Sequence, residues 1–600
     1  MVDSTGLYGA ATVKTNEKTG GITVRSDTFD QAIEGMHKAR MLKVEKQEEK
    51  LEAYQEKLGE LAELESKIKA LADHTRQMYY SNKYGDAGEL GKRIAVASTD
   101  TTKLPEELVD INVDPKCNLK EISLKVKQKA SYDISTATSG VADHTAALGW
   151  TGDFTINGTS IPVTADMSLQ DIVHAGNNSS VSDLTFAKLS VVKSSDNDYR
   201  LSVQSTKLAS PLVITDTLDT NGDPSTAVPA DSGKTVSELS AKFDFNGLTD
   251  IISSSNTISD VADGLTIVLK AADPATTIGI TIENDKASAM QSVLDFAEKY
   301  NEFNDVLQRN RAFDIETQQP GEDAILYGKG ILNTLDTKFR GLLQGNAIGA
   351  GANDLQNLTQ FGITLDRHGK MSVDDTKLSD NILNNFDKFL KLFEFNFESS
   401  SRDFVVSDHP ATMNKKIVED SNGNPVTTNI KVLKDGAGEI TVELSVVGGD
   451  FNGKTYTIPS DKIKTYGGSV IEFNGTDAID GGAELPYKDV VFRYVGIDTL
   501  ANGASVDADM TFSQGFSDRV TKTVENLTNI ENGLFKAEKD TMTTEEEKLK
   551  EEIETLTRSN ERKRERDERQ FSKLEAFMAQ MEPLKAMTDA FMQSVKNSKK

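Results

Sequence analysis

Residues 549–595 read LKEEIETLTRSNERKRERDERQFSKLEAFMAQMEPLKAMTDAFMQSV, and the fold follows from this stretch. Hydrophobic side chains recur in it at alternating spacings of three and four residues for about six heptads, which is typical of a helix that packs along a partner helix. Between Asn560 and Gln570 the seam is polar, so we expect a continuous helix with a weak, hydrated contact there. Pro583 should kink the helix, since proline in a helix interior costs roughly 3 kcal/mol.

A second stripe with the same spacing lies between Val44 and Ala72, with Lys and Glu between the apolar positions. A single stripe of this kind is equally typical of a helix packed on the core of its own domain. Two such stripes near opposite ends of the chain predict that the termini pair and project beyond the body of the protein. The predicted seam consists of Leu51, Tyr54, Leu58, Leu61, Ile68, Ile553, Leu556, Phe571, Leu574, Phe577, Met578, Met581, Leu584 and Phe591.

The length and the charge of the chain limit its class. Six hundred residues are too many for one core, so three to five domains are expected. The 67 basic and 94 acidic residues give a net charge of −27, which argues against nucleic-acid binding. The mixed run at 561–570 does not alter this, because its acids offset its bases. No stretch approaches the length and apolarity of a membrane span, and Met1–Gly6 lacks a secretory signal pattern, so no membrane insertion is predicted.

The periodicity of the remaining sequence alternates between helix and strand. From about Ile94 to Ile282 the period is two, and Asn157-Gly158 between two short strands predicts a β-hairpin. The predicted fold class is α+β multidomain, with a terminal coiled-coil or helical-bundle stalk, discontinuous in sequence, and inserted antiparallel β-rich head domains. We expect a flexible segment at 1–27, a helical stalk at 28–90, β-rich heads at 91–285 with one inserted in the other, a helical stalk domain with a β-hairpin at 286–399, an inserted β-rich accessory domain at 400–512, and a C-terminal helical stalk at 513–600.

Residues that carry catalysis or bind metals are not clustered in the sequence. The six histidines show no metal-ligand spacing, and the single Cys117 excludes an intrachain disulfide. Asp219–Asp223 resembles the start of a calcium loop, but Pro224 replaces its glycine and Ala230 its bidentate glutamate. Neither a nucleophile elbow nor a phosphate loop is present. We therefore predict no enzyme activity, no metal and no cofactor.

Several short motifs, weak singly, occur in a fixed order along most of the chain. The motifs are FTING at 154–158, SLQDI at 168–172, YRLSV at 199–203, FDFNG at 243–247, SNTISD at 255–260, DGLTIVL at 263–269, FAEKYN at 296–301, FGITLD at 361–366 and QFSKLEAFM at 570–578. In this order the chain resembles the flagellar filament cap proteins, the hook-associated protein 2 family. One departure is at the start, where Gly20–Val24 and Asp27–Ile33 stand in place of the usual Gly-Leu-x-Ser-Gly-Leu-Asp segment. Block 400–512 is also longer than the family pattern needs.

The resemblance implies a structural protein at the distal tip of the bacterial flagellar filament, which retains exported flagellin and promotes its polymerisation. It implies a homo-oligomeric ring of about four to six copies, contacts with flagellin and hook–filament junction proteins, an export chaperone, and secretion through the flagellar type III apparatus. We expect the Phe and Met side chains between Phe571 and Phe591 to dock on flagellin or the junction. The alternative is that they pack against residues 44–72 of the same chain.

Two other functional classes remain open from the sequence. A surface adhesin would use the β domains, above all 400–512, to bind host or surface glycans, and this activity could coexist with capping. An intracellular coiled-coil scaffold would need only the two heptad stripes, but it leaves the ordered β motifs unexplained.

Overall fold

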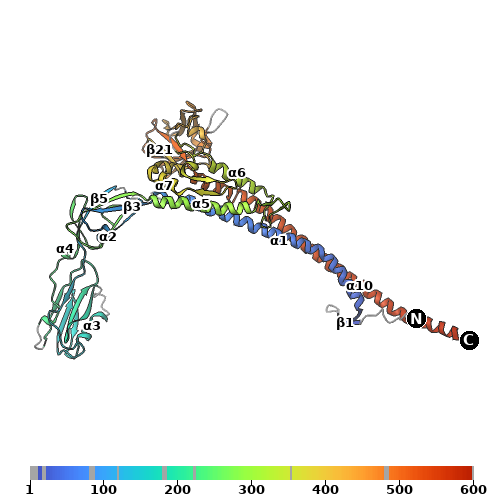
Figure 1. Cartoon of the computed structure of the whole chain (residues 1–600), viewed down its shortest axis with the longest axis horizontal. Helices are drawn as coiled ribbons and strands as arrows, with labels where there is room; N and C mark the ends of the chain where they lie inside the picture. The colour runs from blue at the N-terminus through green and yellow to red at the C-terminus, as the bar shows by residue number, and fades with distance from the viewer. Residues whose placement is uncertain are drawn as a thin grey trace. The chain divides into compact units, whose positions relative to one another are not determined.

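The computed structural model describes residues 11–15, 22–79, 88–115, 117, 120–178, 186–220, 225–351, 355–478 and 486–597 (Figure 1). The chain forms two compact units. The first contains residues 1–76, 294–381 and 387–600, and the second contains residues 77–293 and 382–386. Long terminal helices and antiparallel sheets make up the structure, so the predicted fold class is confirmed.

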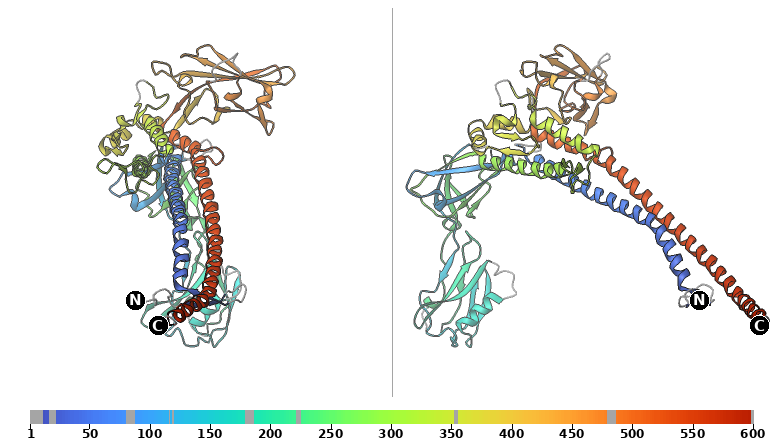
Figure 2. Two further views of the ribbon diagram at one scale, coloured as in Figure 1. Left: turned by 90° about the vertical axis from the view of Figure 1, so that its right-hand side faces the viewer. Right: turned by 45° about the vertical axis from the view of Figure 1, so that its right-hand side comes forward.

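The first unit is organised by the two terminal helices, α1 (Asp27–Gln77) and α10 (Leu534–Asn597). They lie side by side in both views of Figure 2 and run antiparallel, because Gln55 bonds to Glu546 and Gln47 to Glu552. The predicted pairing of the termini is therefore observed. Helix α10 is continuous through the polar run, as expected, and it also continues through Pro583.

The polar part of the seam is better packed than expected. Asn560 is only 5% exposed, and its Nδ2 donates a hydrogen bond of 3.3 Å to the backbone oxygen of Arg40. Arg40 also forms an ion pair of 2.7 Å with Asp567. The expectation of a hydrated contact is thus wrong at Asn560, because its amide finds a backbone acceptor on α1 that heptad spacing does not reveal.

Towards its C-terminus α1 is joined by further helices. Helix α5 (Lys286–Arg309) runs antiparallel to it, with ion pairs from Lys67 to Glu302 and from Arg309 to Glu60. Helix α9 (Phe516–Leu527) reaches it through a hydrogen bond between Thr75 and Thr521. The remaining elements here are β17 (Phe313–Asp314), β18 (Gln319–Pro320), α6 (Gly330–Gln344), β19 (Ile363–Leu365), β20 (Met371–Val373), α7 (Asp375–Asn384) and α8 (Phe386–Phe393).

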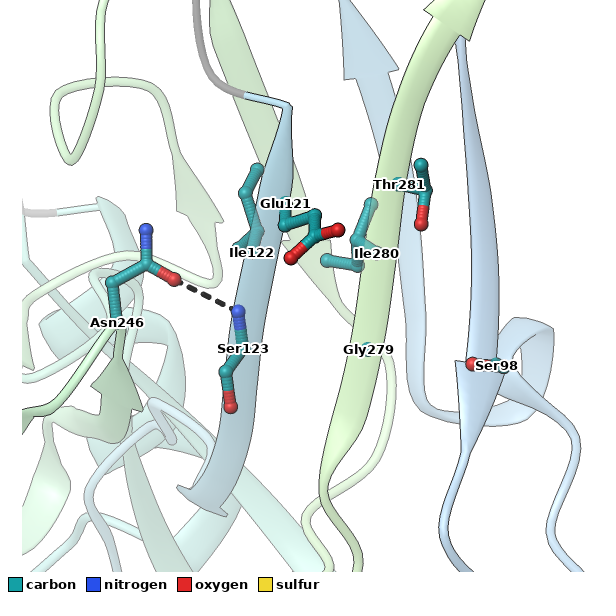
Figure 3. Close-up of a pocket in the computed structure, with 8 residues that line it drawn as sticks. All are labelled: Ser98, Glu121, Ile122, Ser123, Asn246, Gly279, Ile280 and Thr281. Carbon is teal, nitrogen blue, oxygen red and sulfur yellow. Dashed lines mark hydrogen bonds between the residues drawn. The ribbon is translucent and has the colours of Figure 1, made fainter.

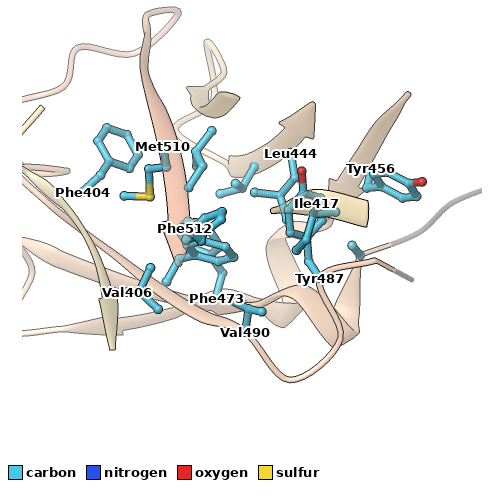
Figure 4. Close-up of a cluster of buried hydrophobic side chains, with 14 of the residues drawn as sticks. Phe404, Val406, Ile417, Leu444, Tyr456, Phe473, Tyr487, Val490, Met510 and Phe512 are labelled. Atoms are coloured by element: carbon cyan, nitrogen blue, oxygen red, sulfur yellow. The ribbon is translucent and has the colours of Figure 1, made fainter. Parts of the chain in front are cut away.

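The accessory β domain of the first unit is a two-sheet sandwich. One sheet has the order β21-β29-β23-β24-β25 and the other β22-β28-β27-β26. Phe404, Tyr487 and Phe512 belong to the buried core between them (Figure 4). Because Phe395 pairs with Gln514, the sandwich extends beyond both ends of the range 400–512. The strands are β21 (Phe395–Ser399), β22 (Phe404–Asp408), β23 (Thr427–Lys434), β24 (Ile440–Val447), β25 (Thr455–Ile458), β26 (Lys464–Tyr466), β27 (Val470–Asn474), β28 (Val491–Val495) and β29 (Ser505–Gln514).

The second unit contains two separate β cores. In the first, a sheet of order β13-β12-β5-β16-β3 and a sheet of order β14-β15-β4 bury Phe243, Ile267 and Ile280. Buried and exposed side chains alternate along β5, with Ile122 and Leu124 buried and Ser123 exposed. One face of the strand therefore packs on the core, and the other, the solvent-exposed or wet face, does not. The elements are β3 (Arg93–Thr99), α2 (Pro105–Leu108), β4 (Val109–Val113), β5 (Glu121–Gln128), α4 (Val236–Leu239), β12 (Ala241–Phe245), β13 (Leu248–Ser253), β14 (Thr257–Ile258), β15 (Leu265–Leu269) and β16 (Ile278–Asn284).

The second β core lies within the sequence of the first, and it buries Trp150 and Phe154. Asn157 and Gly158 adopt φ angles of 51° and 84° between two paired strands, β7 and β8, so the predicted hairpin has a primed turn. Sheets of order β6-β10-β9 and β11-β7-β8 flank this core. The elements are β6 (Ile134–Thr136), β7 (Gly152–Ile156), β8 (Thr159–Val163), α3 (Leu169–Asn178), β9 (Ala187–Ser195), β10 (Asp198–Ser205) and β11 (Ile214–Asp216).

The N-terminal segment differs from its prediction as a flexible stretch. Strands β1 (Ala11–Thr15) and β2 (Ile22–Ser26) pair as an antiparallel hairpin. Both strands are rich in β-branched residues, which favour extended backbone, although neither is long enough to show a clear period. Residues 1–10 and 16–21 lie outside the described part of the chain, as do residues 221–224 of the rejected calcium loop.

A buried carboxylate connects three backbone segments near the boundary between the two β cores. Asp133 is fully buried, and its carboxylate accepts hydrogen bonds from the Leu212 backbone (2.8 Å), the Ser232 hydroxyl (2.7 Å) and the Lys234 ammonium (3.4 Å). Burial raises the pKa of this carboxyl, but the three donors outweigh burial, and the pKa is lowered overall. Ionised Asp133 therefore stabilises the fold.

Replacing Asp133 with Asn should lower the free energy of unfolding by about 2 kcal/mol at pH 7, since a carboxylate with three donors is lost. Because the pKa of Asp133 is lowered in the folded state, its stabilisation is present above pH of about 4 and is lost as the pH falls further. Urea unfolding of wild type and D133N at several pH values measures this, and the difference should shrink in acid. D196N is the control, because Asp196 is 95% exposed. A difference independent of pH would contradict the assignment.

The buried Asn560 makes a second prediction about stability. Asn560→Leu should raise the free energy of unfolding of the α1–α10 coil by about 1 kcal/mol, because a polar seam residue with one long hydrogen bond is replaced by an apolar one. Helical circular dichroism during thermal unfolding reports the change. The exposed Glu561→Leu change should have no such effect, and a destabilised N560L chain would show that the amide contact outweighs apolar packing.

Candidate functional site

The seam between α1 and α10 changes along its length, and the predicted residues divide accordingly. Leu61 and Ile68 are buried, whereas Leu51, Tyr54, Leu58, Ile553 and Leu556 are half-buried in the two-helix part. Leu64 and Leu71 are also fully buried, although they were not predicted. Each lies three residues after a predicted seam position, so a wider apolar face of this helix was the signal that strict heptad spacing missed.

The coil ends where α1 begins. The rings of Phe29, in the first turn of α1, and Phe571 of α10 lie 5.2 Å apart. Beyond this pair α10 continues to Asn597, about 39 Å of helix at 1.5 Å per residue. The antiparallel register places residues 44–72 of α1 opposite earlier parts of the C-terminal region, near Glu546 and Glu552. The idea that the distal Phe and Met residues pack against 44–72 is therefore wrong.

The distal part of α10 carries a row of exposed apolar side chains, which we call the C-terminal stripe. Phe577 is 59% exposed, Phe591 67% and Met587 72%. Contiguous exposed apolar surface of this kind marks an interaction site, and Met and Phe side chains adapt to differing partners. The C-terminal stripe consists of Leu574, Phe577, Met578, Met581, Leu584, Met587, Phe591, Met592 and Val595.

Most of the C-terminal stripe coincides with predicted seam residues, and three members, Met587, Met592 and Val595, do not. Phe571 is half-buried against Phe29 and closes the coil, so it is not part of the stripe. Met587 and Met592 were missed because they lie beside the heptad positions on a helix that has no α1 residue opposite. An amphipathic helix outside a two-helix coil carries a broader apolar face than heptad spacing alone selects.

A second surface feature lies on the wet face of the β13-β12-β5-β16-β3 sheet (Figure 3). Gly279 is paired between Ser98 and Ser123, and its missing side chain leaves an open hollow of about 400 Å³. Glu121 and Thr281 line its side, and the Asn246 amide oxygen accepts a hydrogen bond from the Ser123 backbone. The hollow is shallow and polar, and it lacks the arrangement of a nucleophile and a base that catalysis requires.

Two further kinds of feature are absent from the described ranges, a metal cluster and a membrane-spanning helix. No group of three or more His, Cys, Asp or Glu side chains there is placed to hold a metal ion. Among the same residues, no helix combines the length and apolarity needed to cross a membrane. The C-terminal stripe is thus the strongest candidate for function in the described part of the chain.

Comparisons with known proteins place this geometry in context. The family model described as flagellar hook-associated protein 2 C-terminus matches residues 239–583. The lateral flagellar hook-associated protein 2 of Vibrio parahaemolyticus is 27% identical over 301 residues, which are 46% of this chain and 63% of that protein. The flagellar hook-associated protein 2 of Salmonella typhimurium is 27% identical over 192 residues, 31% of this chain and 37% of its own length.

A solved structure was also matched. The crystal structure of the D1, D2 and D3 domains of the flagellar cap protein from Escherichia coli has 20% identity and a TM-score of 0.37, covering 56% of this chain and 89% of that one. The alignments to the two relatives above span less than two thirds of the length of each. The family model, in contrast, covers more than half of the present chain, and on that match the chain belongs to the flagellar hook-associated protein 2 family.

Proposed function

We propose that this protein caps the distal end of the bacterial flagellar filament, retains exported flagellin there and promotes its polymerisation. Family membership supports the proposal, and the observation that carries it is the C-terminal stripe at the end of a paired coil. An exposed apolar helix extending beyond its coil is suited to insertion among the helices of other subunits. The role is steric and conformational, and it requires no cofactor and no bond-making step.

The proposal includes specific partners. A ring of about four to six copies would close the filament end, since repetition of one interface generates a ring when the rotation closes. Flagellin and hook–filament junction proteins are the proposed partners of the C-terminal stripe. Export through the flagellar type III apparatus, with a dedicated chaperone, would deliver the protein to the extracellular filament tip. Glycan binding by the accessory sandwich stays a prediction from the sequence.

Deletion of the gene tests the proposed role directly. A strain without the protein should make short or absent filaments and should release monomeric flagellin into the medium, because nothing retains it at the tip. Electron microscopy and quantification of flagellin in the same cultures measure both effects, with a complemented strain as control. Normal filaments without released flagellin would refute the capping role.

Substitution of the C-terminal stripe tests its part in docking. The triple change Phe577→Ser, Met581→Ser and Phe591→Ser should reduce occupancy of filament ends at least about tenfold, since each change removes an apolar anchor. Immunogold counting of purified protein on filament ends measures this occupancy. Ile315→Ser, Leu248→Ser and Ile530→Ser form the matched control, because these side chains are 84%, 64% and 84% exposed and lie outside α10.

A truncated chain that ends at Ser572 gives an independent reading of the same prediction. It keeps the Phe29–Phe571 contact and the Arg40–Asp567 ion pair, so the coil should melt as in the full chain. Loss of binding with an unchanged coil would support docking by the C-terminal stripe. Full binding by this truncated chain would contradict it.

A further inference from the structure

Charges along the α1–α10 coil are separated into two belts. The basic belt contains residues 34–43 of α1 and 558–569 of α10, with nine Lys or Arg and five Asp or Glu. The acidic belt contains residues 46–55 and 545–554, with nine Glu and four Lys. Contacts between Arg40 and Asp567, and between Gln47 and Glu552, show that each belt combines both helices. A chain with a net charge of −27 thus has a locally positive segment directly beside a negative one.

Contacts within the coil neutralise only part of these charges. Lys548 pairs with Glu545, Lys550 with Glu546, and Arg558 with Glu554. The exposed excess remains, because several side chains of each sign form no ion pair with any described residue. These are Arg562, Lys563 and Arg566 in the basic belt, and Glu48, Glu547 and Glu551 in the acidic belt.

The spacing of the belts matches the repeat of the coil. Their centres on α10 are separated by about 14 residues, which is two heptads and about 21 Å of helix. A second coil shifted by two heptads presents the same face, so its acidic belt then lies opposite the basic belt of the first. Because the coil becomes complementary to an identical coil when one is shifted along the other, we take its partner to be a second copy of this chain. An unrelated acidic partner would match the basic belt alone.

We propose that coils of neighbouring copies pack side by side and parallel, with an axial offset of about two heptads that places the basic belt of one copy against the acidic belt of the next. This arrangement rests on the proposed ring of copies. Such a head-to-tail contact is heterologous, and it closes into a ring if each coil is inclined to the ring axis so that the axial offset does not accumulate. Each exposed ion pair contributes little by itself, so the belts select register and orientation and respond to salt.

Charge reversal in the full chain tests the pairing of the belts. Arg562→Glu, Lys563→Glu and Arg566→Glu should weaken self-association about tenfold in sedimentation velocity at low salt, because three cross-subunit pairs become repulsive. Glu48→Lys, Glu547→Lys and Glu551→Lys should weaken it similarly. Mixing the two variants in equal amounts should restore association, since one then has two acidic belts and the other two basic belts. Added salt should weaken the wild-type assembly.

The control alters charge by the same amount elsewhere. Lys462→Glu, Lys464→Glu and Lys488→Glu change exposed side chains of the accessory sandwich and should leave self-association unchanged. Equal association by the basic-belt variant and this control would overturn the proposal, and so would failure of the mixture to recover.

Crosslinking distinguishes the parallel offset from an antiparallel pair. A two-heptad parallel shift places residue 565 of one copy opposite 551 of one neighbour and opposite 579 of the other. Antiparallel pairing of the same belts places 565 opposite about 548, near 551, and leaves 579 far from 565. A short bismaleimide should therefore join Glu565→Cys to Ala579→Cys in mixed samples, and the native Cys117 is fully buried. Crosslinking only between Glu565→Cys and Glu551→Cys would overturn the parallel arrangement.

The belt proposal and the capping role fail in different ways. If the reversed variants still bind filament ends and assemble as the wild type does, the belts are wrong and capping stands. If the wild-type chain does not self-associate at any salt concentration, the belt proposal is overturned, and flagellin release by the deletion strain decides the capping role separately.

Discussion

The antiparallel pairing of α1 with α10 is the constraint on which the first unit depends. It joins residues more than 500 positions apart, as the Arg40–Asp567 ion pair shows. Closing so long a loop costs conformational entropy, although the cost grows only slowly with loop length. Burial of the seam, complete at Leu61 and Ile68, offsets that cost. Because both ends of the chain are held in one coil, the β domains between them are insertions into a helical frame.

The coil has three parts with different surroundings. At the C-terminal end of α1, helices α5 and α9 pack beside it, and Leu64 and Leu71 are buried as well. In its middle, one buried amide at Asn560 and one ion pair set the register. Beyond Phe571 no described residue of α1 lies opposite α10, and the apolar positions face solvent. Burial of the apolar side chains thus decreases along the coil, while the surface available to partners increases.

The accessory sandwich is attached to this frame by a buried polar contact. Gln514, at the end of β29, is fully buried, accepts a hydrogen bond from the Met413 backbone and donates one of 2.8 Å to Asp518 on α9. His409 stacks on Phe395 and lies 3.3 Å from the same Asp518. Lys522 of α9 forms an ion pair with Asp408, and this contact raises the pKa of Lys522 against the effect of burial, which lowers it. A hydrogen bond to Asp518 and an ion pair with Lys522 therefore hold the sandwich against α9.

Periodicity alone determined the element types of this protein. The period of two and the Asn157-Gly158 pair predicted the hairpin, and the heptad spacing predicted two long helices that meet. Most of the C-terminal stripe was predicted as well, because apolar spacing on a helix is a local property. Local patterns could not show which seam residues find a partner, since that depends on where α1 begins relative to α10. Phe571 has Phe29 opposite it, whereas Phe577 has no α1 residue opposite.

Only the tertiary structure decided the register of α1 against α10. That register fixes the basic and acidic belts and the extent of the C-terminal stripe. The run at 561–570 is nearly neutral in sequence, yet it forms part of a basic belt once Lys38, Arg40 and Lys43 lie beside it. Asn560 is polar in the sequence and buried in the fold, because the backbone oxygen of Arg40 accepts its hydrogen bond. Burial and net charge both depend on neighbours that are hundreds of residues away, and folding brings those neighbours together.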